Sequence, residues 1–352
     1  MRRAMSGKYR SKQEMQRIVD RFFSNCRERG YSEEITSEVW RQIESFAGYS
    51  FSKAHSASYA VESFQSLYLK AHYPLEFMVA VINNFGGFYR TWVYVHEARR
   101  YGATIELPCV NKSTYKTTIY GSDIYIGFIH IQSLEYKVAQ SIEEIRASDG
   151  PFTDLNDFVT RVNPGLEQLI LLIRAGALRF TGRKKSVLLW EAHMMINRNR
   201  HEETRPLFST PVKDFSLPDL AQGEMEDVYD EIELFGFPVT MSWFGMLETS
   251  FRGDISARSM EDYVGKKVRM VGHLVTVKYI KTVKNDWMNF GCFIDHEGSF
   301  FDTVHFSASL KDWPFKGSGT YLILGKVVEE FGFPSLEVEK MAKLPVKPDK
   351  RY

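Results

Sequence analysis

The spacing of apolar positions divides the chain into a long helical part and a strand-rich part. Apolar residues recur every three or four positions over 11–30 and 34–83, which predicts helices with breaks near Gly48 and at Pro74. A glycine-rich turn at 83–89 precedes a helix to about residue 101, and 107–128 has the pattern of a loop with short strands. Helices are expected again from 133 to about 200.

The last third of the chain has a different pattern. Residues 201–222 contain three prolines and no sustained period, which predicts a linker, and a short acidic helix is expected after it. From 264 to 344 apolar residues alternate in strand fashion, interrupted by turns at 295–298, 316–319 and 331–334. Five short strands over this length suit a small barrel.

Composition limits the class of protein. The chain has 352 residues, of which 44% are hydrophobic and 14% aromatic, enough to fill two or three compact domains. No apolar run reaches the roughly 18 residues of a membrane helix, and the basic first dozen residues do not resemble a signal peptide. We therefore expect a cytoplasmic protein with no membrane partner. The three cysteines lie far apart, which favours reduced thiols over a disulfide framework or a zinc site.

The net charge of +1 conceals a strong segregation of charge along the chain. Three basic runs contain no acidic residue: Arg2, Arg3, Lys8, Arg10 and Lys12; Arg174, Arg179, Arg183, Lys184 and Lys185; and Lys266, Lys267, Arg269, Lys278, Lys281 and Lys284. Each run could follow a phosphate backbone. One acidic helix face is expected to repel DNA, made of Glu224, Glu226, Asp227, Asp230, Glu231 and Glu233. The alternative interpretation is that all four runs are solvated surface.

Residues 46–70, FAGYSFSKAHSASYAVESFQSLYLK, place Lys53 and His55 at the start of a predicted helix. A basic helix N-terminus is a suitable seat for a phosphate. Together with 2–15 and 68–82, this segment resembles the end of the fingers domain in the bacterial DNA polymerase III alpha subunit family. The resemblance continues through a tandem helix-hairpin-helix region and an OB-fold domain, and covers most of the chain.

The resemblance implies a multidomain protein in which mostly α-helical fingers and helix-hairpin-helix regions are followed by a small all-β OB-fold barrel. The expected boundaries are 1–85 for the fingers-like region, 86–200 for a connecting helix and the tandem hairpins, 201–260 for the linker and acidic helix, 261–345 for the barrel, and 346–352 for a tail.

For the fingers-like region, the resemblance implies that Lys53 and His55 contact the triphosphate of an incoming dNTP, where cations neutralise the leaving pyrophosphate. Arg2, Arg3 and Lys8 would line the same channel. Without the resemblance, Lys53 would be an ordinary surface lysine and His55 a hydrogen-bonded core histidine.

The two hairpins differ in the residues that could hold a phosphate. The segment 126–148 resembles the first hairpin, but Ser133, Leu134 and Glu135 stand where the family has Gly-x-Gly, which favours a structural role. The segment 166–193 resembles the second hairpin. Its predicted DNA-binding residues are Gly176, Arg183, Lys184 and Lys185. The alternative for this second hairpin is a glycine-capped helix pair with a basic surface.

The barrel candidate carries the longest basic run, and OB-folds bind single strands by charge and base stacking. The predicted DNA-binding residues of the barrel are Lys278, Lys281, Lys284, Trp287 and Phe293. Alternation along 287–295 places Trp287 and Phe293 on one face, and Phe290 on the other, together with Met288, Cys292 and Ile294. If the latter face is buried, Trp287 and Phe293 are stacking platforms; otherwise they close the ends of the barrel or pack on the preceding helix.

The linker holds a candidate clamp-binding peptide at 204–208, TRPLF, in which Leu207 and Phe208 could enter an apolar groove on the sliding clamp. Thr204 stands where the family has glutamine. The alternative is a linker that packs on a neighbouring domain.

No pair of closely spaced carboxylates lies on a predicted palm strand, although two-metal nucleotidyl transfer needs such a pair. We therefore predict no catalytic residue, metal site or bound cofactor in this chain; Mg²⁺ belongs to the palm of a complete DNA-directed DNA polymerase. The expected function is DNA binding in replication, on primer-template and single-stranded template, with dNTP, the sliding clamp and other replisome subunits as further partners, but no polymerisation by the chain alone. A non-catalytic DNA-binding accessory protein and an interaction module derived from the polymerase remain the alternatives.

Overall fold

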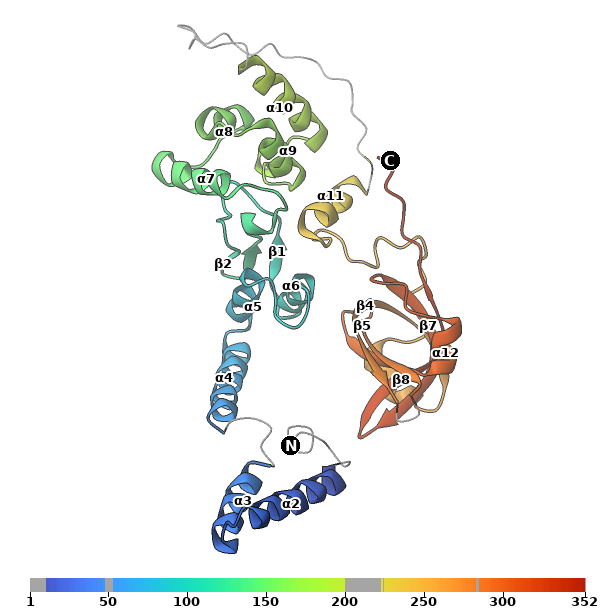
Figure 1. Ribbon diagram of the computed structural model, residues 1–352. Helices are drawn as coiled ribbons and strands as arrows, with labels where there is room; N and C mark the ends of the chain where they lie inside the picture. Colours follow the sequence, from blue (N-terminus) through green and yellow to red (C-terminus); the bar gives the residue numbers. More distant parts are fainter. Residues whose placement is uncertain (1–10, 48–52, 200–222, 224, 283–284, 352) are drawn as a thin grey trace. The chain divides into compact units, whose positions relative to one another are not determined.

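The computed structural model describes residues 11–47, 53–199, 223, 225–282 and 285–351, and the chain falls into two compact units, Met1–Tyr73 and Pro74–Tyr352 (Figure 1). The division at Tyr73 differs from the expected boundary at residue 85. Helix α5 belongs to the second unit because it packs on α6 and on the strands that follow.

The first unit consists of helices. They are α2 (Ser11–Glu28), α3 (Glu33–Ala47) and α4 (Lys53–His72). Trp40 of α3 is buried against the rings of Phe22 and Phe23 on α2, at centroid distances of 5.2 and 6.3 Å. Helix α4 ends at His72, directly before the break predicted at Pro74, and α3 ends at Ala47, while Gly48 lies outside the described residues.

The second unit begins with two helices and a small sheet, which are α5 (Pro74–Asn83), α6 (Thr91–Arg100), β1 (Thr104–Glu106), β2 (Thr118–Tyr120) and β3 (Asp123–Tyr125). The strand order is β1-β3-β2, with β1 parallel and β2 antiparallel to β3. Apolar residues of α5, α6 and β3 form its core, among them Met78, Ala98 and Ile124.

A helical domain follows, with a single core that includes Phe158, Leu169 and Leu172. Its elements are η1 (Phe128–His130), α7 (Tyr136–Asp149), α8 (Leu155–Val162), α9 (Leu166–Arg174), η2 (Arg179–Thr181) and α10 (Lys185–Asn199). Its position in the sequence agrees with the expected tandem hairpins.

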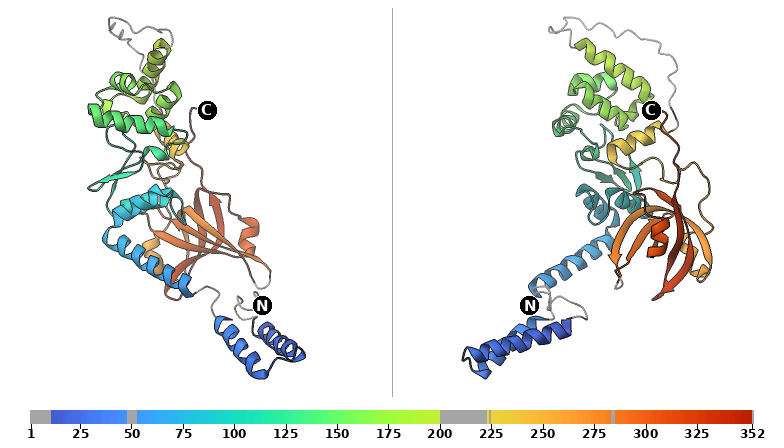
Figure 2. Two further views of the ribbon diagram at one scale, coloured as in Figure 1. Left: turned by 60° about the vertical axis from the view of Figure 1, so that its left-hand side comes forward. Right: turned by 45° about the vertical axis from the view of Figure 1, so that its right-hand side comes forward.

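The C-terminal domain is a closed five-stranded barrel with strand order β4-β5-β6-β8-β7 around one apolar core. Its strands are drawn in orange and red in Figure 2. Its elements are η3 (Ala257–Tyr263), β4 (Lys267–Lys281), β5 (Trp287–Ile294), β6 (Phe300–His305), α12 (Ser307–Asp312), β7 (Thr320–Glu330) and β8 (Phe333–Lys343). This order, with a helix between β6 and β7, is consistent with the OB-fold predicted from the sequence.

Gly272 leaves the space in which the aromatic rings of the barrel core pack. A Cβ at this position would lie 2.6 Å from Cζ of Phe301 and 2.8 Å from Cβ of Phe293. We expect Gly272→Ala to lower the free energy of unfolding of the second unit by about 1–3 kcal/mol, because an extra methyl overpacks a rigid core. Urea unfolding followed by circular dichroism measures this. Gly165→Ala is the control, since its Cβ would meet open space; equal losses in both variants would contradict the expectation.

In the acidic helix α11 (Glu226–Phe235), Asp230 and Glu231 are buried, so these two residues do not belong to a solvated face, whereas Glu224 lies outside the described residues. Glu231 is buried, and its carboxylate accepts hydrogen bonds from the amides of Val239 and Thr240 at 2.6 and 2.9 Å.

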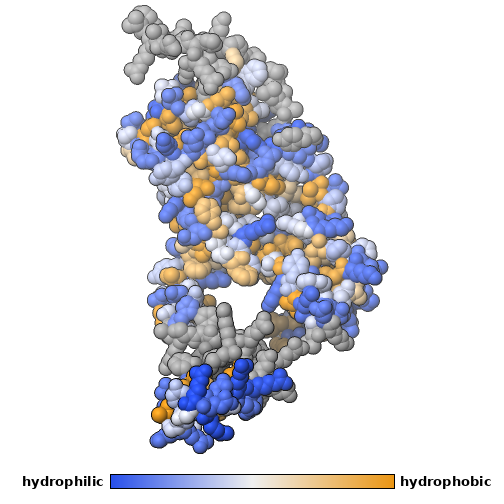
Figure 3. All heavy atoms as spheres, in the orientation of Figure 1, coloured by the Kyte–Doolittle hydropathy of each residue, from blue (hydrophilic) through white to orange (hydrophobic). Residues whose placement is uncertain are grey.

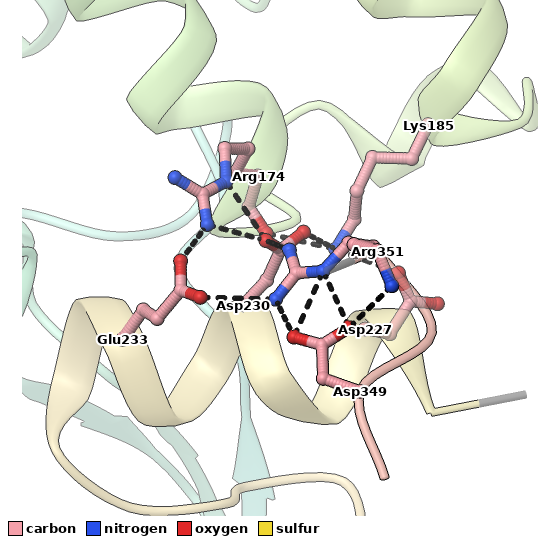
Figure 4. A network of polar contacts seen from close by, with 7 residues as sticks. All are labelled: Arg174, Lys185, Asp227, Asp230, Glu233, Asp349 and Arg351. Carbon is pink, nitrogen blue, oxygen red and sulfur yellow. Dashed lines mark hydrogen bonds and ion pairs between the residues drawn. The ribbon is translucent and has the colours of Figure 1, made fainter. Parts of the chain in front are cut away.

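Asp230 of the same helix is the centre of an ion-pair hub that joins α9, α10, α11 and the C-terminal residues (Figure 4). Its carboxylate lies 2.7 Å from Arg174, 3.2 Å from Lys185 and 2.6 Å from Arg351. The remaining members of the hub are Asp227, Glu233 and Asp349. The basic run near the second hairpin is thus partly neutralised by α11, and the expected tail packs on this helix.

Candidate nucleic-acid interface

The ribbon formed by β4 and β5 carries two pairs of a lysine and an aromatic residue. Lys278 lies opposite Phe290, and Lys281 opposite Trp287, in the antiparallel register. Directly opposed residues point to the same face of a sheet, and alternation puts these two pairs on opposite faces. All four residues are exposed: Lys278 and Phe290 lie on the outer face of the barrel, and Lys281 and Trp287 lie at the end of the ribbon.

Lys281 and Trp287 are already in contact, since the ammonium lies 5.0 Å from the centroid of the indole ring. Trp287 is 54% exposed, so one face of its ring is open to a base. Cations beside exposed rings are the combination that holds single strands without sequence preference. The predicted residues Lys278, Lys281 and Trp287 therefore lie together on one surface element, whereas Lys284 lies outside the described residues.

The prediction for Phe293 is wrong. Its ring is fully buried in the barrel, where it stacks on Phe301 and Phe315 at centroid distances of 5.6 and 6.3 Å. The odd-numbered positions Asn289 and Gly291 also point inward, so the face of β5 that contains Phe293 is the core face. Phe290, on the other face and 38% exposed, has the surface position expected for Phe293.

Several exposed aromatic residues of the barrel were missed at the level of sequence, and three of them lie at the ends of hairpins. Tyr279 is 62% exposed on β4, and Phe331 and Phe333 are 100% and 77% exposed at the turn between β7 and β8. Positive φ angles at Phe331 and Gly332 form this tight turn. The motif FGFP could have predicted this exposure, because a phenylalanine inside a two-residue hairpin turn cannot reach the barrel core.

In the second hairpin, the turn after α9 is a helix cap. Gly176 has φ +74°, and its amide donates to the carbonyl of Ile173 at 3.0 Å, while Ala177 donates to Leu172 at 2.9 Å. These amides complete the helix end, so the amide of Gly176 is not available to a phosphate. The glycine-cap interpretation accounts for this residue.

The three cations after the turn differ in their surroundings. Lys185 is held by Asp227 and Asp230 and donates to the carbonyl of Arg174 at 2.8 Å, which corrects its assignment to DNA binding. Arg183 is ion-paired with Glu191 but is exposed, as is Lys184. These two side chains remain candidates for phosphate contacts.

A side chain of the second hairpin forms hydrogen bonds with the backbone of the first hairpin. Gln168 accepts a hydrogen bond from the amide of Glu135 at 2.8 Å and donates to the carbonyl of Ser133 at 3.3 Å. Ser133 has φ +65°, a conformation in which glycine is far more common. The amide of Glu135 is thus used within the protein.

In the fingers-like region, His55 is exposed on α4 and its ring contacts Tyr59 edge-on at 4.4 Å, which excludes the alternative of a core histidine. Lys53 is the first residue of α4; its side chain lies outside what the structure describes. Arg2, Arg3 and Lys8 also lie outside the described residues, and so do Leu207 and Phe208 of the candidate clamp peptide.

The turn at 295–298 contains an acidic residue with a structural role. Asp295 is buried, and it accepts hydrogen bonds from the amides of Ser299 and Ala257 at 2.8 and 2.7 Å.

Among the residues that the structure describes, no three His, Cys, Asp or Glu side chains are grouped as metal ligands. None of the described helices is long and apolar enough to cross a membrane.

Comparison with known proteins places these elements in context. A family profile described as a helix-hairpin-helix motif matches residues 102–188. The chain is 35% identical over 192 residues to the DNA polymerase III subunit alpha of Thermus aquaticus, covering 53% of this chain and 16% of that protein. It is 33% identical over 196 residues to an error-prone DNA polymerase of Mycobacterium bovis, covering 54% and 18%.

A longer match, to the DNA polymerase III subunit alpha of Aquifex aeolicus, is 28% identical over 290 residues and covers 81% of this chain and 24% of that protein. The chain thus spans less than a quarter of the length of these relatives. A single-stranded DNA binding protein of Thermus aquaticus matches 24% of this chain and 42% of its own at 15% identity, with a TM-score of 0.22, which is too low to add to the barrel topology. The resemblance to the DNA polymerase III alpha subunits is confirmed.

Proposed function

We propose that this chain, which is homologous to one part of the bacterial DNA polymerase III alpha subunits, binds DNA during replication and holds the single-stranded template on its C-terminal barrel. The observation that carries the proposal is the β4–β5 ribbon, where Lys278 and Lys281 each lie opposite an exposed aromatic ring. Each face of the ribbon thus supplies a phosphate contact beside a stacking platform.

The barrel provides further support. Tyr279, Phe331 and Phe333 are exposed rings at the ends of two hairpins, and exposed aromatic side chains of this number are unusual on a surface that contacts only water. A role in sequence recognition is not part of the proposal, because lysines and ring faces accept any base.

The helical parts have a second role in the proposal. Arg183 and Lys184 contact the backbone of a primer-template duplex, and Lys53 and His55, with Arg2, Arg3 and Lys8, bind the triphosphate of an incoming dNTP. The metal-dependent transfer step, with its Mg²⁺, belongs to carboxylates of a polymerase palm. Contacts of Leu207 and Phe208 with the sliding clamp belong to the same proposal.

The test is fluorescence anisotropy of a labelled single strand and of a primer-template across a salt series. We expect log–log slopes steeper than about −3 for the unmodified chain, because several counterions are released. Lys278→Glu with Lys281→Glu should weaken single-strand binding at least tenfold and make the slope shallower by about 1.4, since each lost phosphate contact contributes about 0.7.

The control variant is Lys311→Glu with Lys340→Glu, which reverses two exposed lysines on α12 and β8 of the same barrel. It should retain affinity and slope. Equal losses in both double variants would show only a general charge effect, and binding without salt dependence would contradict the proposal.

A non-catalytic accessory protein would bind DNA with the same barrel but would not bind nucleotide. Titration with a fluorescent dNTP separates this alternative from the polymerase role. A pure interaction module would bind neither DNA nor dNTP.

A further inference from the structure

The turn between α5 and α6 displays aromatic side chains that the proposed function does not use. Phe85 is 58%, Phe88 86% and Tyr89 37% exposed, within the segment Asn84–Arg90. In Figure 3, hydrophobic residues also gather on the visible face at the level of α5 and α6. Burial of rings of this size would be favourable by roughly 1.5–3 kcal/mol each, so their exposure calls for a partner.

The turn is held in one conformation. Phe85 has φ +58°, which is disfavoured for a bulky residue, and its amide donates to the carbonyl of Ile82 at 2.9 Å. The hydroxyl of Tyr94 accepts from the amides of Gly87 and Tyr89, both at 3.3 Å.

Gly86 is required within this turn. A Cβ there would lie 2.5 Å from the carbonyl oxygen of Tyr89, and φ is +79°. A strained turn fixed by several hydrogen bonds presents its rings with little loss of conformational entropy on binding, which is the property of a preorganised contact surface.

The turn lies beside the barrel. The ring of Trp92, two residues after Arg90, contacts that of His273 on β4 edge-on at a centroid distance of 5.2 Å. Helix α6 contacts the same part of the barrel, since His96 lies 3.0 Å from the carbonyl oxygen of Gly298.

On its other side the turn reaches the helical domain. The ring of Phe85 contacts His130 edge-on at a centroid distance of 5.4 Å, and His130 lies in η1, three residues before Ser133 of the first hairpin. Arg90, exposed at the start of α6, adds a cation to the same turn. The rings therefore lie between the barrel face and the first hairpin.

We infer that the α5–α6 turn is a base-stacking platform that carries single-stranded DNA from the outer face of the barrel toward the helix-hairpin-helix domain. The inference rests on the proposed function of the barrel. The contact with β4, the strand that carries Lys278, and the adjacent Arg90 favour a polyanion with planar bases as the occupant. Phe85 and Phe88 stack on successive bases, and each stack contributes about 1–3 kcal/mol.

The test compares two labelled oligothymidine strands in anisotropy titrations, a short one of about 8 nucleotides, within the site size of a single OB-fold, and a longer one of about 20 nucleotides. The variant is Phe85→Asn with Phe88→Ser, because asparagine tolerates positive φ. We expect it to bind the longer strand at least tenfold more weakly and the short strand as the unmodified chain does. Tyr101→Ser, an exposed ring at the end of α6, is the control and should change neither affinity.

The outcomes distinguish the inference from the proposed function. If the unmodified chain binds neither strand, the proposed function fails. Two results overturn the inference when the unmodified chain binds both strands. In one, the double variant binds the longer strand as tightly as the unmodified chain does, which leaves a protein partner as the occupant of the turn. In the other, the double variant loses affinity for the two strands equally. Photocrosslinking of a 5-iodouracil strand should label residues 84–90, and labelling confined to the barrel would also overturn it. Unchanged circular dichroism melting confirms that the variant is folded.

Discussion

Replacing Asp230 by alanine is expected to destabilise the second unit by about 3 kcal/mol, close to the effect of breaking a buried ion pair. Its side chain is only 6% exposed and faces Arg174, Lys185 and Arg351, whose side chains are 17–25% exposed. Removal of the carboxylate leaves these cations crowded together without their central counter-charge. Urea unfolding followed by circular dichroism gives the free energy.

Two further variants separate the possible causes. Asp230→Asn keeps the size of the side chain and removes its charge, so it should lose most of the same stability. Asp227→Ala removes a carboxylate of the same hub that is 48% exposed, and should cost under about 1 kcal/mol. An Asp230→Asn variant as stable as the unmodified chain would show that charge does not stabilise the hub.

The second unit is also expected to lose stability steeply between pH 6.5 and pH 4. Burial lowers the pKa of His130 and of His305 to about 4, and burial, followed by the charges of Lys343 and Arg90, lowers the pKa of His273 to about 3. An unfolded histidine titrates near 6.5. In this window the unfolded chain therefore binds protons that the folded chain does not, and stability falls as pH falls.

Each buried histidine contributes a slope of about 1.4 kcal/mol per pH unit, so the three together give up to about 4. Urea unfolding at pH 7, 6 and 5 measures the slope. His305→Asn should reduce the slope by about 1.4 kcal/mol per pH unit, because one buried histidine fewer binds a proton on unfolding. A free energy of unfolding that is constant from pH 7 to pH 5 would rule out this account.

The parts of the fold that the sequence predicts correctly are those that near neighbours determine. The helix break at Pro74 follows from backbone preferences, and the five strands of the barrel follow from local alternation. Lys278, Lys281 and Trp287 belong to a single hairpin, so a strand prediction alone brings them together.

The wrong predictions concern residues whose surroundings are formed by residues far away in the sequence. Both faces of β5 contain apolar residues, and the inward face was fixed by Phe301 and Phe315, which pack on Phe293 from other parts of the barrel. Lys185 resembled a DNA-binding cation because its partners are more than 40 positions away in α11. The local sequence pattern predicts whether a segment is a helix or a strand, but it does not identify the residues that pack on that segment.

The return of the C-terminal residues to α11 has a mechanical consequence for the barrel. The chain enters the barrel from α11 and leaves it through an isolated bridge between Leu247 and Val346, after which Arg351 pairs with Asp230. A domain tethered at one end can swing in all directions, but one tethered at both ends beside the same helix turns only about the axis through its two attachments. The barrel and the hairpins are thereby held at a limited range of separations, so in the proposed function a strand bound to one of them finds the other at a high effective concentration.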